Sequence, residues 1–169
     1  PKDVEDVKAL VNFVSQKSKV KGQMLSLTAR SGGTDMTGAP LGDSVVLDMA
    51  KHFNKIIEVQ PRYAVVEPGV YYRDFEKEAL KHALFLPSYP ASKEICAIGG
   101  MVANNSGGEK TLAYGKTDKY VQELKVVFSD GNEYLVKPLG KGELDAKMAQ
   151  DDFEGGVYNK LYKLIIDNW

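Results

Sequence analysis

The sequence is poor in the residues that build thiol and metal chemistry. Its 169 residues include one cysteine, Cys96, and two histidines, His52 and His82. A single cysteine excludes an intrachain disulfide and a thiolate zinc cluster. We expect Cys96 to be a small buried apolar residue. The two histidines lie in amphipathic stretches and leave little for a metal site or a catalytic triad, so we expect no bound metal.

Excess charge and long apolar runs are missing too. The net charge is −1, so no basic surface indicates nucleic acid or anionic lipid as a partner. No apolar run approaches the ~20 residues of a membrane span, and no secretory signal opens the chain. We therefore expect a cytoplasmic protein with no indicated membrane association. Because the sequence starts at Pro1 without a methionine, we expect an excised domain.

Glycine is concentrated in two loops, residues 30–38 (RSGGTDMTG) and 98–108 (IGGMVANNSGG). Glycine leaves its amide N–H uncovered and permits φ > 0, so successive N–H groups can converge on an anion. In the first loop the hydroxyls of Ser31, Thr34 and Thr37 can donate to phosphate oxygens. Asp35 cannot donate, and we expect it to order the loop. Taken alone, this loop fits a decorated turn equally well.

The second loop is apolar around its glycines, which predicts a buried loop, yet it carries Asn104, Asn105 and Ser106. Buried polar groups need partners. These partners are either a ligand ring with amide-like edges or the asparagines' own backbone in turns. Together the two loops predict an elongated ligand with a phosphate-bearing middle and a ring-like end.

The hydrophobic pattern predicts a mixture of helices and strands. It indicates helices over 4–19, 72–84 and 157–166, strands over 24–29 and 45–48, hairpins over 56–67 and 121–136, and a polar loop over 140–150. The strands and helices do not alternate regularly, which predicts an α+β fold in two lobes rather than a doubly wound sheet.

Two familiar nucleotide signatures fail. No Gly-x-Gly-x-x-Gly opens a helix. Gly115-Lys116-Thr117 imitates the end of a mononucleotide phosphate loop, but Lys110 stands where that motif requires glycine.

Several segments in order carry a family resemblance. They are residues 30–38, 65–70, 86–92, 96–100, 105–108 and 114–115. Over roughly residues 3 to 140 the chain resembles the FAD-binding domain of the vanillyl-alcohol oxidase / p-cresol methylhydroxylase (PCMH-type) flavoproteins. It is most similar to the FAD-linked oxidase branch, which contains glycolate oxidase flavin subunits and D-lactate dehydrogenases. The resemblance implies a small N-terminal α/β lobe over about 1–60 and a larger lobe over 61–169, with a mixed sheet flanked by helices.

The resemblance also implies which residues hold FAD. Residues 31–35 would wrap the pyrophosphate, and Pro68 and Gly69 would let the chain pass close to the cofactor. The residues that would line the ribityl and flavin side are Pro90, Ser92, Gly99, Gly100, Asn105 and Gly107. The implied cofactor-binding residues are Arg30, Ser31, Gly32, Gly33, Thr34, Asp35, Gly38, Pro68, Gly69, Pro90, Ser92, Ile98, Gly99, Gly100, Asn105, Ser106, Gly107 and Gly115.

Two departures from the family pattern refine these expectations. Members that bond flavin covalently through the first loop have a histidine after the two glycines, whereas this chain has Thr34, so we expect non-covalent FAD. The family's further glycine-rich segment and its cap domain do not occur before Trp169. We therefore expect residues 1–169 to be an FAD-binding domain truncated at its C-terminus, with catalytic residues beyond Trp169.

The expected function is hydride transfer from a 2-hydroxy acid, D-lactate-like or glycolate-like, to flavin N5, with the substrate held by the cap domain. Two alternatives stay open at this point. One is an alkylglycerone-phosphate synthase-like FAD enzyme, and the other is a non-catalytic nucleotide-binding module on the same fold.

Overall fold

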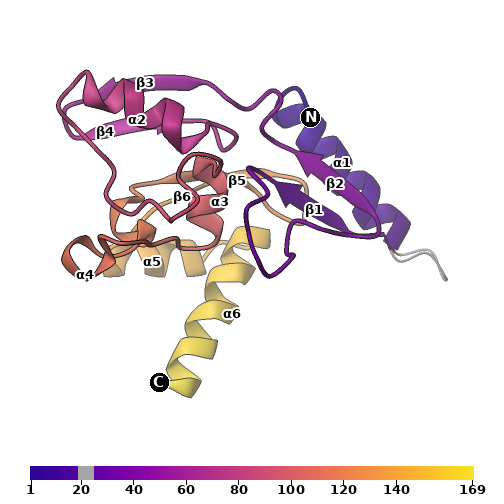
Figure 1. Cartoon of the computed structure of the whole chain (residues 1–169). Coiled ribbons are helices and arrows are strands. Elements are labelled where there is room, and N and C mark those ends of the chain that lie inside the picture. The colour runs from indigo at the N-terminus through magenta and orange to yellow at the C-terminus, as the bar shows by residue number, and fades with distance from the viewer. Residues whose placement is uncertain (19–24) are drawn as a thin grey trace. The chain divides into compact units, whose positions relative to one another are not determined.

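The computed structural model describes residues 1–18 and 25–169 (Figure 1). The chain divides into two compact units. The N-terminal unit is Pro1–Val121 and the C-terminal unit is Gln122–Trp169. Helices and three two-stranded sheets occur together, which confirms the α+β class. Among the described residues these sheets are separate pairs, smaller than the mixed sheet expected for the second lobe. The lobe boundary near residue 60 stays a prediction.

The chain begins with the predicted helix and the two predicted strands, and these strands pair with each other in parallel. Helix α1 covers Val4–Ser18. Strands β1 (Leu27–Arg30) and β2 (Val45–Asp48) pair in parallel, with Leu27 opposite Val45. The expected start of the first strand at residue 24 lies outside the described residues. Because β1 ends at Arg30, the strand delivers the chain directly into the first glycine loop.

The next elements are a hairpin and a helix. Strands β3 (Ile56–Gln60) and β4 (Tyr63–Val66) pair antiparallel, and helix α2 (Tyr72–Leu80) contacts β3. The helix ends earlier than the predicted residue 84. Ala83 has φ +56°, and the N–H of Leu84 donates to the Ala79 carbonyl at 3.1 Å. This is a Schellman-type end, which sequence reasoning missed because alanine stands where glycine is usual.

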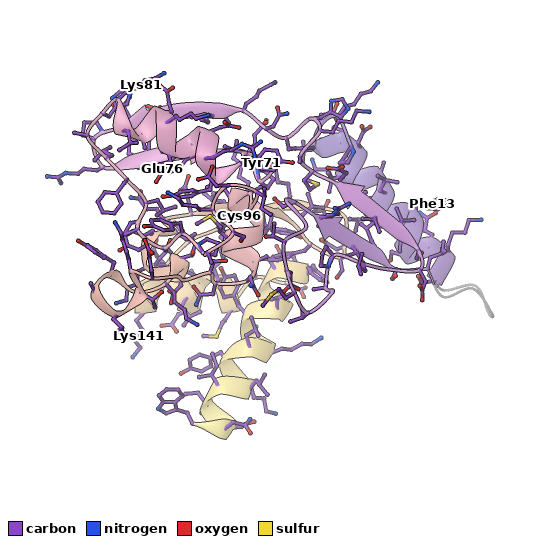
Figure 2. All side chains as sticks on the ribbon, in the orientation of Figure 1. Phe13, Tyr71, Glu76, Lys81, Cys96 and Lys141 are labelled. Atoms are coloured by element: carbon purple, nitrogen blue, oxygen red, sulfur yellow. The ribbon has the colours of Figure 1, made fainter. Side chains whose placement is uncertain are left out.

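The core of the N-terminal unit lies between α2 and the segment that follows it. The buried residues packed together are Val70, Tyr72, Phe75, Ala79, Tyr89, Cys96 and Met101. Cys96, labelled in Figure 2, is one of them, and burial raises the pKa of its thiol. The expectation of a buried apolar cysteine is confirmed. Residues 68–70 and 96–101 are therefore held by a packed core rather than by loop contacts alone.

The second glycine segment is partly helical, which corrects the expectation of a buried loop. Helix α3 covers Ile98–Ala103, so both glycines of the pair stand in its first turn. Two further short elements follow, α4 (Thr111–Tyr114) and the 3₁₀ helix η1 (Thr117–Tyr120). Neither was predicted, because four-residue helices have no periodicity to read.

The C-terminal unit consists of a hairpin and two helices. Strands β5 (Leu124–Val127) and β6 (Glu133–Val136) form the predicted hairpin, with φ +81° at Gly131 in its turn. Helix α6 covers Phe153–Asn168, longer than predicted at both ends.

The predicted loop over residues 140–150 is wrong, because α5 (Lys141–Met148) occupies it. The Glu143 carboxylate accepts a hydrogen bond from the Gly140 N–H at 2.9 Å, which closes the first turn. A polar stretch can therefore be helical when a cap supports it and α6 packs beside it.

Candidate functional site

The first glycine loop presents a row of uncommitted backbone donors. In the described residues, no protein acceptor takes a hydrogen bond from the N–H groups of residues 32–36. Gly33 has φ +67°, a region that favours glycine, and the Arg30 guanidinium lies beside it. Residues 32–35 are half-buried whereas Met36 is exposed, and adjacent N–H groups with a nearby cation suit an anion.

Asp35 orders this loop, as predicted. Its carboxylate accepts hydrogen bonds from the Thr37 hydroxyl, from the Thr37 N–H at 3.2 Å and from the Ala39 N–H at 3.2 Å. The hydrogen bond from the Thr37 hydroxyl is the main cause that lowers the pKa of Asp35. The expected role of the Thr37 hydroxyl as a phosphate donor is not seen, because it donates to Asp35 instead.

The carbonyl of Pro68 joins the two glycine segments. It accepts a hydrogen bond from the Ser31 hydroxyl at 2.7 Å and another from the Gly99 N–H at 2.8 Å. The Ser31 hydroxyl is therefore also engaged within the protein, so any contact of Ser31 with phosphate would use its N–H. Segments that are distant in sequence meet at one acceptor atom.

Glycines at this junction are required by close packing of the chain on itself. A Cβ on Gly32 would lie 2.7 Å from the Ile95 carbonyl oxygen, and a Cβ on Gly99 would lie 2.6 Å from the Pro68 Cβ. A Cβ on Gly69 would lie 2.3 Å from the Met49 carbonyl oxygen. Gly100 differs, because the closest heavy atom to its Cβ would be the Ser31 Cβ at 3.7 Å, an ordinary contact. Among these four glycines, only Gly100 has room for a methyl group.

The far end of α3 turns sharply through Asn105, which has φ +44°. The Ser106 N–H donates to the Met101 carbonyl at 2.9 Å and the Asn105 N–H to the Val102 carbonyl at 3.1 Å, a Schellman end with asparagine in the usual glycine position. The Asn105 side-chain oxygen accepts from the Asp118 N–H at 2.9 Å. The asparagine thus satisfies part of its hydrogen bonding within the protein.

An open pocket of about 320 Å³ lies at this end of α3. Residues 104–108 line it together with Pro90, Thr111 and Lys116. This volume is at the low end for small-molecule sites, so the pocket can hold one part of a dinucleotide but not the whole.

The rim of the pocket is fixed by an aromatic and ionic network. The Tyr89 hydroxyl donates to the Glu109 carboxylate at 2.7 Å, and this hydrogen bond raises the pKa of Tyr89. The Lys110 ammonium lies 4.9 Å from the ring centroid of Phe85 and 5.6 Å from that of Tyr89. Both charged residues next to Gly108 are therefore engaged with neighbours.

The predicted residues fall into two groups in the structure. The first group is the junction at Pro68, which brings together Arg30, Ser31, Gly32, Gly33, Gly69, Ile98, Gly99 and Gly100. The second group lines the pocket and comprises Pro90, Asn105, Ser106 and Gly107. Thr34, Asp35 and Gly38 continue the first loop, Gly115 precedes the pocket residue Lys116, and the Ser92 carbonyl caps the turn that leads to Cys96.

Three pocket residues were missed by the sequence analysis, namely Gly108, Thr111 and Lys116. Asn104, which was expected to need a hydrogen-bond partner, was left out of the implied cofactor-binding residues. The signal for Lys116 was present in Gly115-Lys116-Thr117, which was set aside as a failed phosphate loop. Asn104 and Gly108 stand directly beside predicted residues, whereas nothing in the sequence marks Thr111.

Comparison with known proteins supports a single family. The family described as "FAD binding domain" matches residues 1–135. The chain is 31% identical over 161 residues to a D-2-hydroxyglutarate dehydrogenase of Pseudomonas putida, covering 94% of this chain and 16% of that protein. It is 32% identical to a D-lactate dehydrogenase of Archaeoglobus fulgidus (78% and 28% covered) and 32% identical to the glycolate oxidase subunit GlcD of Bacillus subtilis (83% and 29% covered). The chain thus spans less than a third of the length of these relatives.

Solved structures share the fold. A 6-hydroxy-D-nicotine oxidase from Arthrobacter nicotinovorans matches with a TM-score of 0.69 and 21% identity, covering 85% of this chain and 30% of that one. An alkyldihydroxyacetonephosphate synthase matches with a TM-score of 0.66 and 23% identity, covering 92% and 27%. At these identities the likeness shows the fold alone. In the described part of the chain, no helix has the length and apolar character needed to cross a bilayer.

Proposed function

We propose that this chain, which belongs to the family of FAD binding domains, binds the cofactor of an oxidoreductase. The proposed oxidoreductase acts on a 2-hydroxy acid. The relatives named for D-2-hydroxyglutarate, D-lactate and glycolate support this substrate class. The alkyldihydroxyacetonephosphate synthase is a match in fold only, so no observation favours that alternative. A cytoplasmic location stays a prediction.

The observation that carries the proposal is the fit of the first loop to a pyrophosphate. Residues 32–36 present N–H groups without a protein acceptor, and Arg30 adds a cation beside Gly33. A dinucleotide's pyrophosphate supplies several negatively charged acceptors to such a loop. We assign residues 31–35 to the pyrophosphate and the pocket at the end of α3 to the flavin side.

The chain's own residues would bind and orient the cofactor. When bound, FAD would supply a hydride acceptor for the carbon that bears the hydroxyl, and the hydroxyl proton would be taken up by a base. The protein contributes position and electrostatics, chiefly through main-chain groups on a packed core. No catalytic residue is assigned within residues 1–169. We assign binding of the hydroxy-acid substrate to a region that corresponds to the part of the relatives this chain does not cover.

The direct test is titration of the protein with FAD. Binding is monitored by the quenching of flavin fluorescence and by the visible absorption bands of the flavin that stays with the protein. We expect saturable binding, and we expect Gly33→Val to abolish it, because the branched side chain would meet the Arg30 guanidinium at a residue with φ +67°. Full affinity in that variant would show that the pyrophosphate is placed wrongly. Absence of flavin bands in the wild-type protein after gel filtration has removed free FAD would reject FAD binding.

Two further measurements test the finer parts of the proposal. Because Thr34 replaces the histidine used for covalent attachment, acid precipitation is expected to release all yellow colour into the supernatant. Anaerobic addition of D-2-hydroxyglutarate, D-lactate or glycolate to the whole FAD-loaded protein is expected to bleach the flavin bands with one of them. If none of the three bleaches the flavin bands, the proposed substrate class is rejected. The alternative of a non-catalytic nucleotide-binding module would then be favoured.

A further inference from the structure

The pocket at the end of α3 contains a lysine whose position is fixed from both sides. Gly115 has φ +82° and ψ −169°, a conformation available almost only to glycine, and it turns the chain from α4 toward Lys116. On the other side, the N–H and the hydroxyl of buried Thr117 both donate to the Ser106 carbonyl, at 3.0 and 2.8 Å. The backbone of Lys116 is therefore held against the pocket wall.

Lys116 is the cation of this pocket, and no carboxylate lines it. In residues 1–18 and 25–169, the Lys116 ammonium makes no ion pair with a protein carboxylate. The neighbouring charges are committed elsewhere, with Glu109 on the Tyr89 hydroxyl and Lys110 on the aromatic rings. Lys116 lines the pocket together with Asn104 and Thr111, and side chains of these three types can donate to oxygen acceptors carrying negative charge.

This pocket is separate from the phosphate-binding loop. Gly100, near the start of α3, faces Ser31 of the first loop, whereas the pocket begins after the helix ends. Six helical residues rise about 9 Å at ~1.5 Å each. The first loop already has Arg30 and N–H groups without a protein acceptor for binding phosphate. A second cation at the far end of α3 is therefore placed to bind a different part of the ligand.

We propose that the Lys116 ammonium binds the electron-rich pyrimidine edge of the flavin ring and raises the reduction potential of the bound flavin. This inference rests on the proposed function. The carbonyl oxygens and ring nitrogen of that edge are acceptors, and the negative charge of the reduced ring gathers there. A cation beside it stabilises the reduced form more than the oxidised form, so the potential rises. Lys116 thus tunes the cofactor and is not assigned a step in proton transfer.

The experiment compares Lys116→Gln and Lys116→Arg with a matched control, Lys125→Gln, which removes the same charge from an exposed position on β5. Two quantities are measured for each variant: the affinity for FAD, by fluorescence titration, and the midpoint potential of the bound flavin, by equilibration with a reference dye. The affinity for ADP is measured alongside, because ADP carries the phosphates without the flavin ring.

We expect Lys116→Gln to weaken FAD binding by about tenfold, the low end for a hydrogen bond to a charged group because Lys116 is exposed. The same variant should shift the potential to a more negative value and leave ADP affinity unchanged. Lys116→Arg should keep most of the potential, and Lys125→Gln should match the wild type throughout.

Other outcomes overturn the inference. If Lys116→Gln binds FAD and its potential equals that of the wild type, the lysine does not face the ring. If ADP and FAD affinities fall together while the potential stays, the lysine contacts phosphate. If the wild-type protein binds ADP but retains no flavin after gel filtration has removed free FAD, the proposed function itself fails, and the spectrum of the filtered protein separates this result from the first two outcomes.

Discussion

Adjacent glycines in α3 should respond in opposite ways to the same substitution. In Gly99→Ala the new methyl would lie 2.6 Å from the Pro68 Cβ and 2.8 Å from the Pro68 carbonyl oxygen. Proline cannot rotate away, so the chain at Pro68 must shift. That shift weakens the hydrogen bonds which the Pro68 carbonyl accepts from Gly99 and Ser31.

The size of the effect follows from these contacts. Overpacking costs about 1–3 kcal/mol. Losing the two hydrogen bonds adds up to about 1 kcal/mol each. Alanine's higher helix propensity offsets up to about 1 kcal/mol, so the net loss for Gly99→Ala lies between about 0 and 5 kcal/mol, with a mid-range value near 2–3 kcal/mol. Gly100→Ala meets its closest atom at 3.7 Å and should instead be neutral or more stable by up to about 1 kcal/mol.

The assay is urea unfolding of the N-terminal unit. The single tryptophan, Trp169, belongs to the C-terminal unit, so far-ultraviolet circular dichroism and tyrosine fluorescence are the appropriate probes. Equal unfolding free energies for the Gly99→Ala and Gly100→Ala variants would refute the packing argument. The affinity for FAD is a second measurement on the same variants. If the cofactor approaches Gly100, Gly100→Ala should weaken FAD binding without lowering the free energy of unfolding.

Three other changes test separate parts of the structure. Thr117→Val removes a buried hydroxyl that donates to the Ser106 carbonyl, and it should lower the unfolding free energy by about 1–3 kcal/mol, whereas Thr117→Ser should lose less. Gly156→Ala adds a methyl with no atom within 4 Å in the described residues and should stabilise α6 by about 0.5–1 kcal/mol in thermal unfolding. Burial raises the pKa of Asp130, but its hydrogen bonds, that from the Tyr134 hydroxyl foremost, outweigh burial and hold the pKa below its usual value. The stabilisation is therefore complete above about pH 4 and is lost as the pH falls through the lowered value, so Tyr134→Phe should flatten the acid limb of a stability–pH profile.

The predictions of helices and strands are confirmed where the hydrophobic pattern and the turn residues agree. The hairpin with Asp130-Gly131 at its turn and the strand over 45–48 are examples. The pattern failed for α5, whose polar sequence shows no apolar face and whose start depends on the Glu143 carboxylate folding back onto the Gly140 N–H. Sequence periodicity does not report a cap of that kind.

The candidate site was predictable in its residue types but not in its division of roles. The sequence places Gly99 and Gly100 side by side with nothing to tell them apart. In the structure, Gly99 is required by the approach of Pro68, whereas Gly100 has room for a side chain. That difference depends on a contact between segments about thirty residues apart, which local pattern cannot contain.

The two ends of the proposed site differ in the groups that would hold the ligand. At the first loop the donors are backbone N–H groups of residues 32–36, so binding there depends on the path of the chain, which glycine packing at Gly32 and Gly99 maintains. At the pocket the lining residues include Asn104, Thr111 and Lys116, which carry polar side chains. Substitutions at the first end should therefore change affinity and stability together, since the same backbone serves both. Substitutions of exposed pocket side chains should change the properties of the bound flavin while the fold remains intact.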